Sequence, residues 1–272
     1  MVEVKLPVIV SIATVPSRIA HLRPTLESLL AGELAPTKIF IVRPEYCNWE
    51  SSDYVTPSFL NDDAFCQGII ENVISKVDWG SGTKLLGSVD RLPDQCYLVL
   101  ADDDVAYHPR FLLDIVRAQS AKHDFSFSYY TYRAGGLTFG QGCDGYSFYS
   151  PNLNGIEEFA RKNVLGTSLM YHDDLWIGFF LFMKGITVKQ VDPPIDGQLI
   201  YEQLIPNDVL SSQVSGNLAR DQIFKESFPR LLRSNAVSTS KGFVRKVVYA
   251  YDGAGNLVSR VMARSKRALS RG

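Results

Sequence analysis

The hydrophobic pattern of the first 125 residues alternates between short β-branched runs and longer amphipathic stretches. The apolar runs at residues 7–14 (PVIVSIAT), 38–42 (KIFIV) and 96–102 (CYLVLAD) predict buried strands. The stretches at 19–33 and 110–123 carry apolar residues at helical spacing and predict helices. Strands that trade places with helices in this way favour a mostly parallel α/β sheet flanked by helices, with functional sites at the carboxyl ends of the strands.

Three further segments are less regular. Residues 83–89 (TKLLGSV) predict a short helix and residues 128–133 (SYYTYR) a strand. Residues 64–77 (AFCQGIIENVISKV) fit a helix and a strand equally well.

Length and composition indicate one large globular domain, with or without an appendage. The chain has 272 residues, 46% hydrophobic and 21% charged, with a formal net charge of −1. The most apolar later run, residues 176–183, is far shorter than the ~20 residues that a membrane span needs, and the first residues resemble a strand more than a secretory signal. The scattered cysteines predict reduced thiols rather than a zinc site or a disulfide framework. We therefore expect a cytoplasmic protein.

The C-terminal segment differs electrostatically from the rest. From residue 241 onward, eight basic residues face one acid, Asp252. We expect a main domain over residues 1–235 and a basic extension over 236–272, with a hairpin centred on Asp-Gly and Gly-Asn and then a short helix. The extension suits peripheral contact with the inner face of a membrane or with a polyanionic acceptor, and equally a solvated terminus or a linker. Nothing in the pattern indicates nucleic-acid binding.

Three consecutive aspartates, Asp102, Asp103 and Asp104, follow the apolar strand of residues 97–101. Adjacent carboxylates repel one another, so such a run suggests a divalent cation that neutralises it. Mg²⁺ typically takes one or two protein carboxylates and leaves its other positions to water and substrate phosphates. An Asp-rich turn or a helix N-cap is the alternative interpretation, because a predicted helix follows.

This run resembles the DxD motif of GT-A glycosyltransferases, and three other motifs follow the order seen in a group that includes chlorella-virus glycosyltransferases. The resemblance covers about residues 6–200. It implies a Rossmann-like GT-A fold, a nucleotide-sugar donor, and Mn²⁺ or Mg²⁺ held by Asp102 and Asp104. Asp102 and Asp103 are implied as donor contacts as well, although the particular task of Asp103 is left open.

The first of the other motifs is SIATVPSRIAHL, whose Thr14, Pro16 and Arg18 resemble the TxPxR opening of that group. The resemblance makes these three residues candidate contacts to the nucleotide. A solvated arginine at a helix start is the alternative for Arg18.

The second motif, DWGSGTKLLGSV, resembles a D-x-G-x-x-T-K-L segment and makes Asp78 and Lys84 candidate donor-binding residues. Glycines let a backbone approach a ligand closely, and a lysine at a helix start can place its charge on a phosphate. The segment is not a Walker A loop, because its glycine-to-lysine spacing differs.

The third motif, YHDDLWIGFFLFMKGITV, resembles the acid pair of inverting GT-A enzymes. Asp174 matches the general base, with Asp173 as the second candidate. A carboxylate near an acceptor hydroxyl can take its proton as the hydroxyl attacks the sugar, an effect worth roughly 10²–10⁴-fold. An N-cap pair favoured by the helix dipole is compatible with the same residues, and so is a retaining enzyme.

A glycine- and aromatic-rich stretch, residues 135–154, lies between these motifs. Its family counterpart shapes the sugar pocket, which makes Gly142, Asp144, Gly145 and Tyr146 candidate donor-sugar or acceptor contacts. Core packing is equally compatible with Tyr146, and Trp176 is expected in the core. One departure from the family concerns histidine: all four histidines precede the acid pair, so none stands where many relatives supply a third metal ligand.

Together, these motifs predict a metal-dependent, inverting hexosyl- or deoxyhexosyltransferase that transfers a sugar to a glycan or glycoconjugate hydroxyl, as in polysaccharide biosynthesis. Two alternatives stay open. One is a nucleotide-sugar or carbohydrate-binding protein without turnover. The other is a sugar nucleotidyltransferase, which the glycine-free TVPSR segment disfavours because a phosphate loop is expected there.

Overall fold

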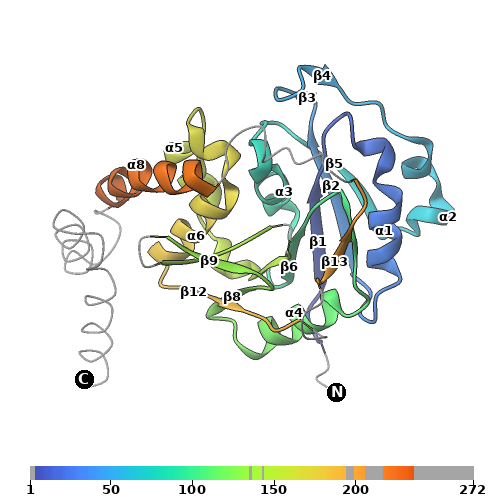
Figure 1. The fold of residues 1–272 in the computed structure, drawn as a ribbon. Coiled ribbons are helices and arrows are strands. Elements are labelled where there is room, and N and C mark those ends of the chain that lie inside the picture. Colours follow the sequence, from blue (N-terminus) through green and yellow to red (C-terminus); the bar gives the residue numbers. More distant parts are fainter. Residues whose placement is uncertain (1–3, 135–136, 143, 194–198, 206–216, 236–272) are drawn as a thin grey trace. The chain divides into compact units, whose positions relative to one another are not determined.

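The computed structural model describes residues 4–134, 137–142, 144–193, 199–205 and 217–235 (Figure 1). These residues fall into two compact units, and every site residue predicted from the sequence belongs to the first. The first unit takes in the described residues up to 132 and from 140 to 205, and the second takes in those of 133–139 and 217–235. The predicted basic extension, residues 236–272, lies outside the described residues.

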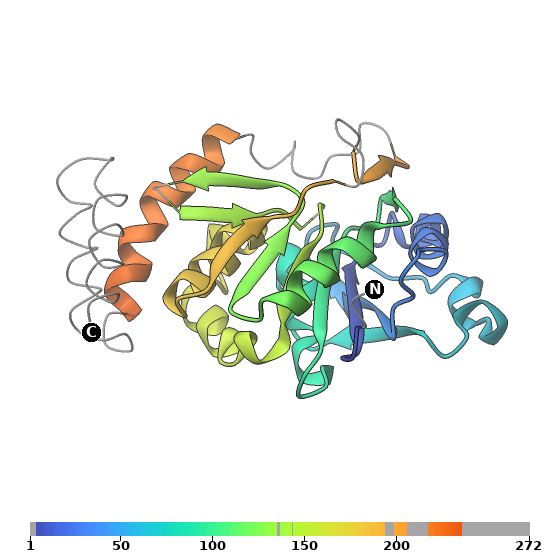
Figure 2. The ribbon, with the colours of Figure 1, turned by 90° about the horizontal axis from the view of Figure 1, so that it is seen from below.

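A seven-stranded sheet forms the centre of the first unit, in the order β12-β8-β11-β6-β1-β2-β5. Every neighbouring pair is parallel except those made by β11, which runs antiparallel to β6 and to β8. The strands are β1 (Val8–Ala13), β2 (Lys38–Pro44), β5 (Ile70–Ser75), β6 (Tyr97–Ala101), β8 (Phe125–Ser128), β11 (Tyr146–Tyr149) and β12 (Thr187–Gln190). Figure 2 shows the β8 and β12 edge from below. The predicted mostly parallel α/β sheet is confirmed.

Different helices cover the two faces of this sheet. Successive residues of a strand point to opposite faces, so neighbouring residues of β1 contact different helices. Val8, Val10 and Ile12 of β1 share one buried cluster with apolar residues of α1 (Arg23–Leu30) and α4 (Phe111–Ala121). Ser11, which points the other way, donates a hydrogen bond to the Lys84 carbonyl in α3 (Thr83–Leu86). The second face therefore brings α3 against the strand that ends at the candidate site.

The ambiguous segment at residues 64–77 contains both kinds of element. Helix α2 (Asp63–Cys66) ends at Gln67, which adopts a left-handed backbone conformation (φ 49°), and β5 begins at Ile70. The long helix expected at 19–33 is shorter, because a 3-10 turn, η1 (Ile19–His21), precedes α1, which has a proline in its first turn.

The described residues form further helices and strands outside this sheet. They are β3 (Tyr46–Cys47), β4 (Ser52–Asp53), η2 (Ser58–Asn61), η3 (Gly80–Gly82), η4 (Val89–Arg91), β7 (Val105–Tyr107), β9 (Thr131–Ala134), β10 (Leu137–Gly140), η5 (Ser150–Leu153), α5 (Ile156–Asn163), η6 (Ser168–Tyr171), α6 (Asp173–Met183) and β13 (Tyr201–Gln203). Helix α8 (Asn217–Asn235) belongs to the second unit, where Phe224 stacks on Phe228. Over the described residues, no helix combines the length and the apolar character needed to cross a membrane.

Candidate functional site

The aspartate run lies at the carboxyl edge of the sheet, directly after β6. Because β6 and β1 are parallel neighbours, with Ile12 opposite Ala101, the segment after β1 reaches the same edge. The run does not cap a helix: β7 follows it, and the N-cap of α4 is Arg110. The alternative of a helix N-cap is therefore wrong, whereas the alternative of an Asp-rich turn agrees with the bend that these residues form between β6 and β7.

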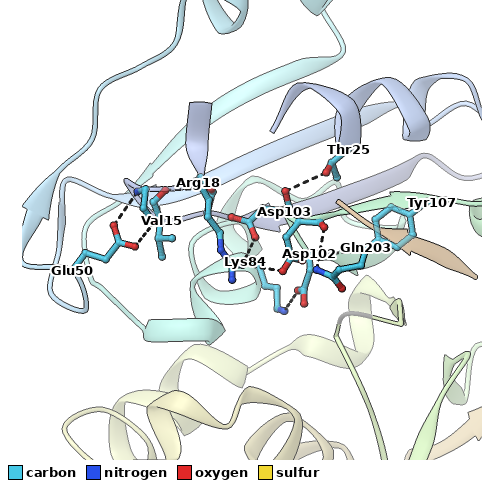
Figure 3. Close-up of polar contacts among 12 residues, drawn as sticks. Val15, Arg18, Thr25, Glu50, Lys84, Asp102, Asp103, Tyr107 and Gln203 are labelled. Carbon is cyan, nitrogen blue, oxygen red and sulfur yellow. Dashed lines mark hydrogen bonds and ion pairs between the residues drawn. The ribbon is translucent and has the colours of Figure 1, made fainter. Parts of the chain in front are cut away.

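Arg18 joins the two strand ends (Figure 3). Its guanidinium forms ion pairs with Asp103 Oδ1 at 3.0 Å and with Asp104 Oδ2 at 3.2 Å. Only 6% of Arg18 is exposed. The alternative of a solvated arginine is therefore wrong, and Arg18 acts as a buried counter-ion of the aspartate run.

Asp103 is the most deeply buried member of the run. Burial raises its pKa to about 6, against the opposing effects of the Arg18 charge and of a hydrogen bond from the Thr14 side chain. Its backbone carbonyl also accepts a hydrogen bond from the Thr25 hydroxyl at 3.1 Å. Asp103 thus ties the run to the segment after β1 and to α1.

Lys84 is the second basic residue of the site. Its Nζ lies 2.7 Å from Asp102 Oδ1 and 3.4 Å from Asp173 Oδ2. Burial disfavours the charged ammonium, but Asp102 and Asp173 outweigh this effect and hold the pKa of Lys84 well above its ordinary value. Figure 3 shows Arg18 and Lys84 both directed at the aspartate run. Lys84 therefore connects the DxD-like motif to the acid pair, which follows it by about 70 residues in sequence.

The acid pair occupies the first turn of α6. Its N-cap is His172, and no side-chain cap bond is formed there, so Asp173 and Asp174 are helical residues rather than caps. The helix dipole nevertheless favours carboxylates in this turn. Asp174 Oδ1 accepts a hydrogen bond of 3.0 Å from the Gly142 backbone N–H. The glycine-rich stretch thereby fixes one oxygen of the candidate base.

Within the glycine-rich stretch, the structure brings some of the predicted residues to the acid pair and uses others for packing. Tyr146 is fully buried, and burial followed by the nearby Asp174 charge raises its pKa well above the ordinary value. Gly145 has φ +75°, and a Cβ there would lie 2.5 Å from Phe111 Cε2. Asp144 is 8% exposed, and its carbonyl accepts a 3.4 Å hydrogen bond from the Tyr129 backbone N–H.

Trp176 lies in the core, as expected, with none of its surface exposed. A Cβ at Gly82 would lie 2.7 Å from Trp176 Cζ2, so this glycine allows the chain before α3 to pack closely on α6. The second motif and the acid pair are therefore held together by packing as well as by charge.

Asp78, Thr14 and Pro16 make contacts that shape the surrounding loops. Both Asp78 oxygens accept backbone N–H groups, those of Asn48 and Gly80, each at 2.9 Å. The Thr14 carbonyl accepts a 2.9 Å hydrogen bond from the Tyr54 hydroxyl. Pro16 lies in the turn after β1, in which the Val15 carbonyl accepts the Arg18 N–H at 3.0 Å.

Three residues that the sequence did not identify also hold the aspartate run. The Tyr107 hydroxyl accepts a hydrogen bond from the Asp102 N–H at 2.8 Å. The Gln203 side chain donates to the Asp104 carbonyl at 3.2 Å, and Thr25 contacts Asp103 as described above. Tyr107 could have been suspected from its place in the short strand after the run, whereas Gln203 is 99 residues away and carries no local signal.

A divalent cation fits this edge if part of its coordination shell comes from a bound diphosphate. Among the described residues, no group of three or more His, Cys, Asp or Glu side chains is placed to hold an ion. Within the run, the Asp102 carboxylate is the most exposed, with 30% of its side chain accessible against 14% for Asp104 and 7% for Asp103. Mg²⁺ and Mn²⁺ favour oxygen ligands and accept as few as one or two protein carboxylates. The more exposed Asp102 and Asp104 therefore fit an open site better than the buried Asp103, although Asp102 also pairs with Lys84 and Asp104 with Arg18.

The fold resembles that of a known glycosyltransferase. A mannosyltransferase, PcManGT from Pyrobaculum calidifontis, solved in complex with GDP-Man and Mn²⁺, superimposes with a TM-score of 0.54 over 98% of this chain and 76% of its own, at 13% sequence identity. No protein-family model matches the sequence, and no curated protein matches it. At this identity the likeness concerns the fold: the chain has the Rossmann-like α/β fold of a glycosyltransferase.

Proposed function

We propose that this protein is a GT-A glycosyltransferase that moves a hexosyl or deoxyhexosyl group from a nucleoside-diphosphate sugar to a hydroxyl of a glycan or glycoconjugate. The observation that carries the proposal is the meeting of two carboxylate groups, the aspartate run and the acid pair, within reach of one lysine. Glycosyl transfer to a hydroxyl needs both a base and a means of neutralising a leaving diphosphate.

In this proposal the donor lies at the carboxyl edge of β1 and β6. Asp102 and Asp104 hold Mn²⁺ or Mg²⁺, and a bound cation of this kind supplies positive charge to the leaving diphosphate. Thr14, Pro16 and Arg18 line the nucleotide side, with Asp78 shaping the neighbouring loop. A nucleotide-sugar donor agrees with the GDP-Man bound by the mannosyltransferase of similar fold.

Asp174 serves as the general base on the acceptor side. Its Oδ1 is fixed by the Gly142 N–H, which orients the carboxylate before any substrate arrives. The acceptor hydroxyl gives its proton to Asp174 as its oxygen attacks the anomeric carbon, and the bond to the diphosphate oxygen breaks. A base opposite the leaving group implies in-line displacement with inversion.

The decisive experiment combines a donor screen with a single substitution. We expect the wild-type protein to hydrolyse or transfer from at least one nucleotide-sugar with Mn²⁺ or Mg²⁺, and to lose this activity in EDTA. Asp174→Asn is expected to lower kcat by roughly 10²–10⁴-fold, with donor Kd near the wild-type value. Undiminished turnover in Asp174→Asn would remove the base assignment.

The same experiment separates the two alternatives. A binding protein without turnover shows a donor-dependent rise in melting temperature but no product with any donor. A nucleotidyltransferase instead consumes a nucleoside triphosphate and a sugar phosphate and releases pyrophosphate.

The basic extension, residues 236–272, is proposed to assist contact with a membrane or a polyanionic acceptor, and removing it tests that role separately.

A further inference from the structure

Lys84 touches both halves of the proposed site. It pairs with Asp102 at 2.7 Å on the donor side and with Asp173 at 3.4 Å on the acceptor side. The lysine side chain is 8% exposed, and the Asp173 side chain is 11% exposed. An ion pair this well buried is screened much less by water and salt than a surface pair.

The backbone around Lys84 is anchored on several sides. The Lys84 carbonyl accepts hydrogen bonds from the hydroxyls of Ser11 in β1 and Ser88, the latter at 3.0 Å. Just before it, the Thr83 hydroxyl accepts the Trp79 N–H at 3.1 Å. The start of the lysine side chain is therefore fixed relative to the strand that ends at the donor edge.

The far end of the side chain is confined by Gly142. A Cβ at Gly142 would lie 2.6 Å from Lys84 Nζ, 3.2 Å from its Cε and 3.8 Å from Asp173 Oδ2. A side chain at this position would therefore displace the ammonium from its place between Asp102 and Asp173. Since the Gly142 N–H also binds Asp174, one glycine positions both the lysine and the candidate base.

Asp173 depends on this lysine. Its Oδ2 atom is buried and has no hydrogen-bond partner among the described residues, although Lys84 Nζ lies 3.4 Å away. A buried carboxylate oxygen without a hydrogen bond needs a nearby positive charge. Lys84 supplies that charge to the acid pair while it holds Asp102.

We infer that Lys84 is a positioning residue, a counter-ion shared by Asp102 and the acid pair. It keeps these carboxylates in fixed positions relative to each other, so that the base and the leaving group act on one substrate. This inference rests on the proposed function and refines one part of it. The sequence motif suggested instead that Lys84 contacts a donor phosphate directly. Such a contact would require the ammonium to leave Asp102, Asp173 or both.

The positioning role and a direct phosphate contact of Lys84 predict different kinetics. If Lys84 is a positioning residue, Lys84→Met misplaces the carboxylates and lowers kcat, by about 100-fold for a displacement near 1 Å. The donor Kd in the presence of Mn²⁺ then stays near the wild-type value. Loss of a direct phosphate contact instead weakens donor Kd by tenfold or more (~1.4 kcal/mol). Arg91→Met is the matched control, because Arg91 forms an exposed pair with Glu71 at 2.7 Å and is expected to change neither quantity. A weakened Kd with unchanged kcat overturns the inference.

A second measurement does not need activity. If Lys84 and Asp173 compensate each other, Lys84→Met lowers the melting temperature by leaving Asp173 buried without its counter-ion, and adding Asp173→Asn restores part of the loss. A double variant that melts no higher than Lys84→Met overturns the inference, even if the single variant is too unstable for kinetics. If the wild type transfers no sugar while this coupling is found, the proposed function fails and the pairing stands.

Discussion

Removing the positive charge of Arg18 gives a sharp test of the buried aspartate run. Arg18→Met leaves Asp103 and Asp104 without their shared partner, in a place where 7% and 14% of the two side chains are exposed. Breaking a buried ion pair by removing one partner costs about 3–5 kcal/mol. We expect a loss of this size in the free energy of unfolding at pH 8, measured by urea denaturation in metal-free buffer with EDTA.

The free energy of unfolding lost in Arg18→Met depends on pH, and the titration of Asp103 sets the direction of this dependence. Its folded pKa of about 6 lies above the ordinary 3.8, so the folded protein holds the extra proton and stability falls as pH rises between these values. Without Arg18 the folded pKa is higher still, and this fall continues above pH 6 at up to about 1.4 kcal/mol per pH unit. The difference between wild type and Arg18→Met should therefore be larger at pH 8 than at pH 6.

Arg91→Met again serves as the control. Its pair with Glu71 is exposed, with 50% and 37% of the side chains accessible, so the expected loss is below about 1 kcal/mol at either pH. An Arg18→Met loss that is equally small, or that is the same at pH 6 and pH 8, would refute the assignment of Arg18 as a buried counter-ion.

Two other substitutions test residues that the structure places in loops around the site. Gly145→Ala should lower the free energy of unfolding by about 2–4 kcal/mol, because it combines a positive φ with a clash against Phe111; a melting temperature equal to that of the wild type would contradict the packing. Asp78→Ala removes the acceptor of two backbone N–H groups, those of Asn48 and Gly80, and should cost about 1–3 kcal/mol in urea denaturation. If Asp78→Ala weakens donor binding but leaves stability unchanged, Asp78 contacts the donor rather than shaping its loop.

The layers of the fold were predictable from local pattern, whereas several pairings were not. The buried strands Val8–Ala13 and Tyr97–Ala101 are almost wholly apolar, which is typical of strands covered on both faces. The antiparallel direction of Tyr146–Tyr149 has no such signal, because strand direction depends on how the connections run. The short helix predicted at residues 83–89 is present as α3, but its four residues are too few for periodicity to show which side is buried.

The candidate site, like the fold, was predictable in its local motifs but not in its long-range contacts. The sequence indicated which residue types gather at the carboxyl edge, and the structure brings the end of β1, the run after β6, Lys84 and the acid pair together there. Sequence reasoning expected Lys84 to contact a phosphate, because a lysine at a helix start behind a glycine-rich turn can place its charge there. Its burial depends on Gly142 and Asp173, which lie far along the chain and could be linked to it only through the fold.

The charges of the assembled site give a physical reason why the proposed transfer would need a cation. Five carboxylates, the aspartate run and the acid pair, are gathered around two basic side chains, Arg18 and Lys84. Ion pairs with these two side chains leave an excess of negative charge at this edge, where the proposed donor would place its diphosphate, and two anionic groups in a partly buried site repel strongly. Asp102 is the most exposed carboxylate of the run, so a divalent cation held there would lower the repulsion between the run and a donor diphosphate. Arg18 and Lys84 then keep the remaining carboxylates in place, which explains why the basic residues of this site face aspartates rather than solvent.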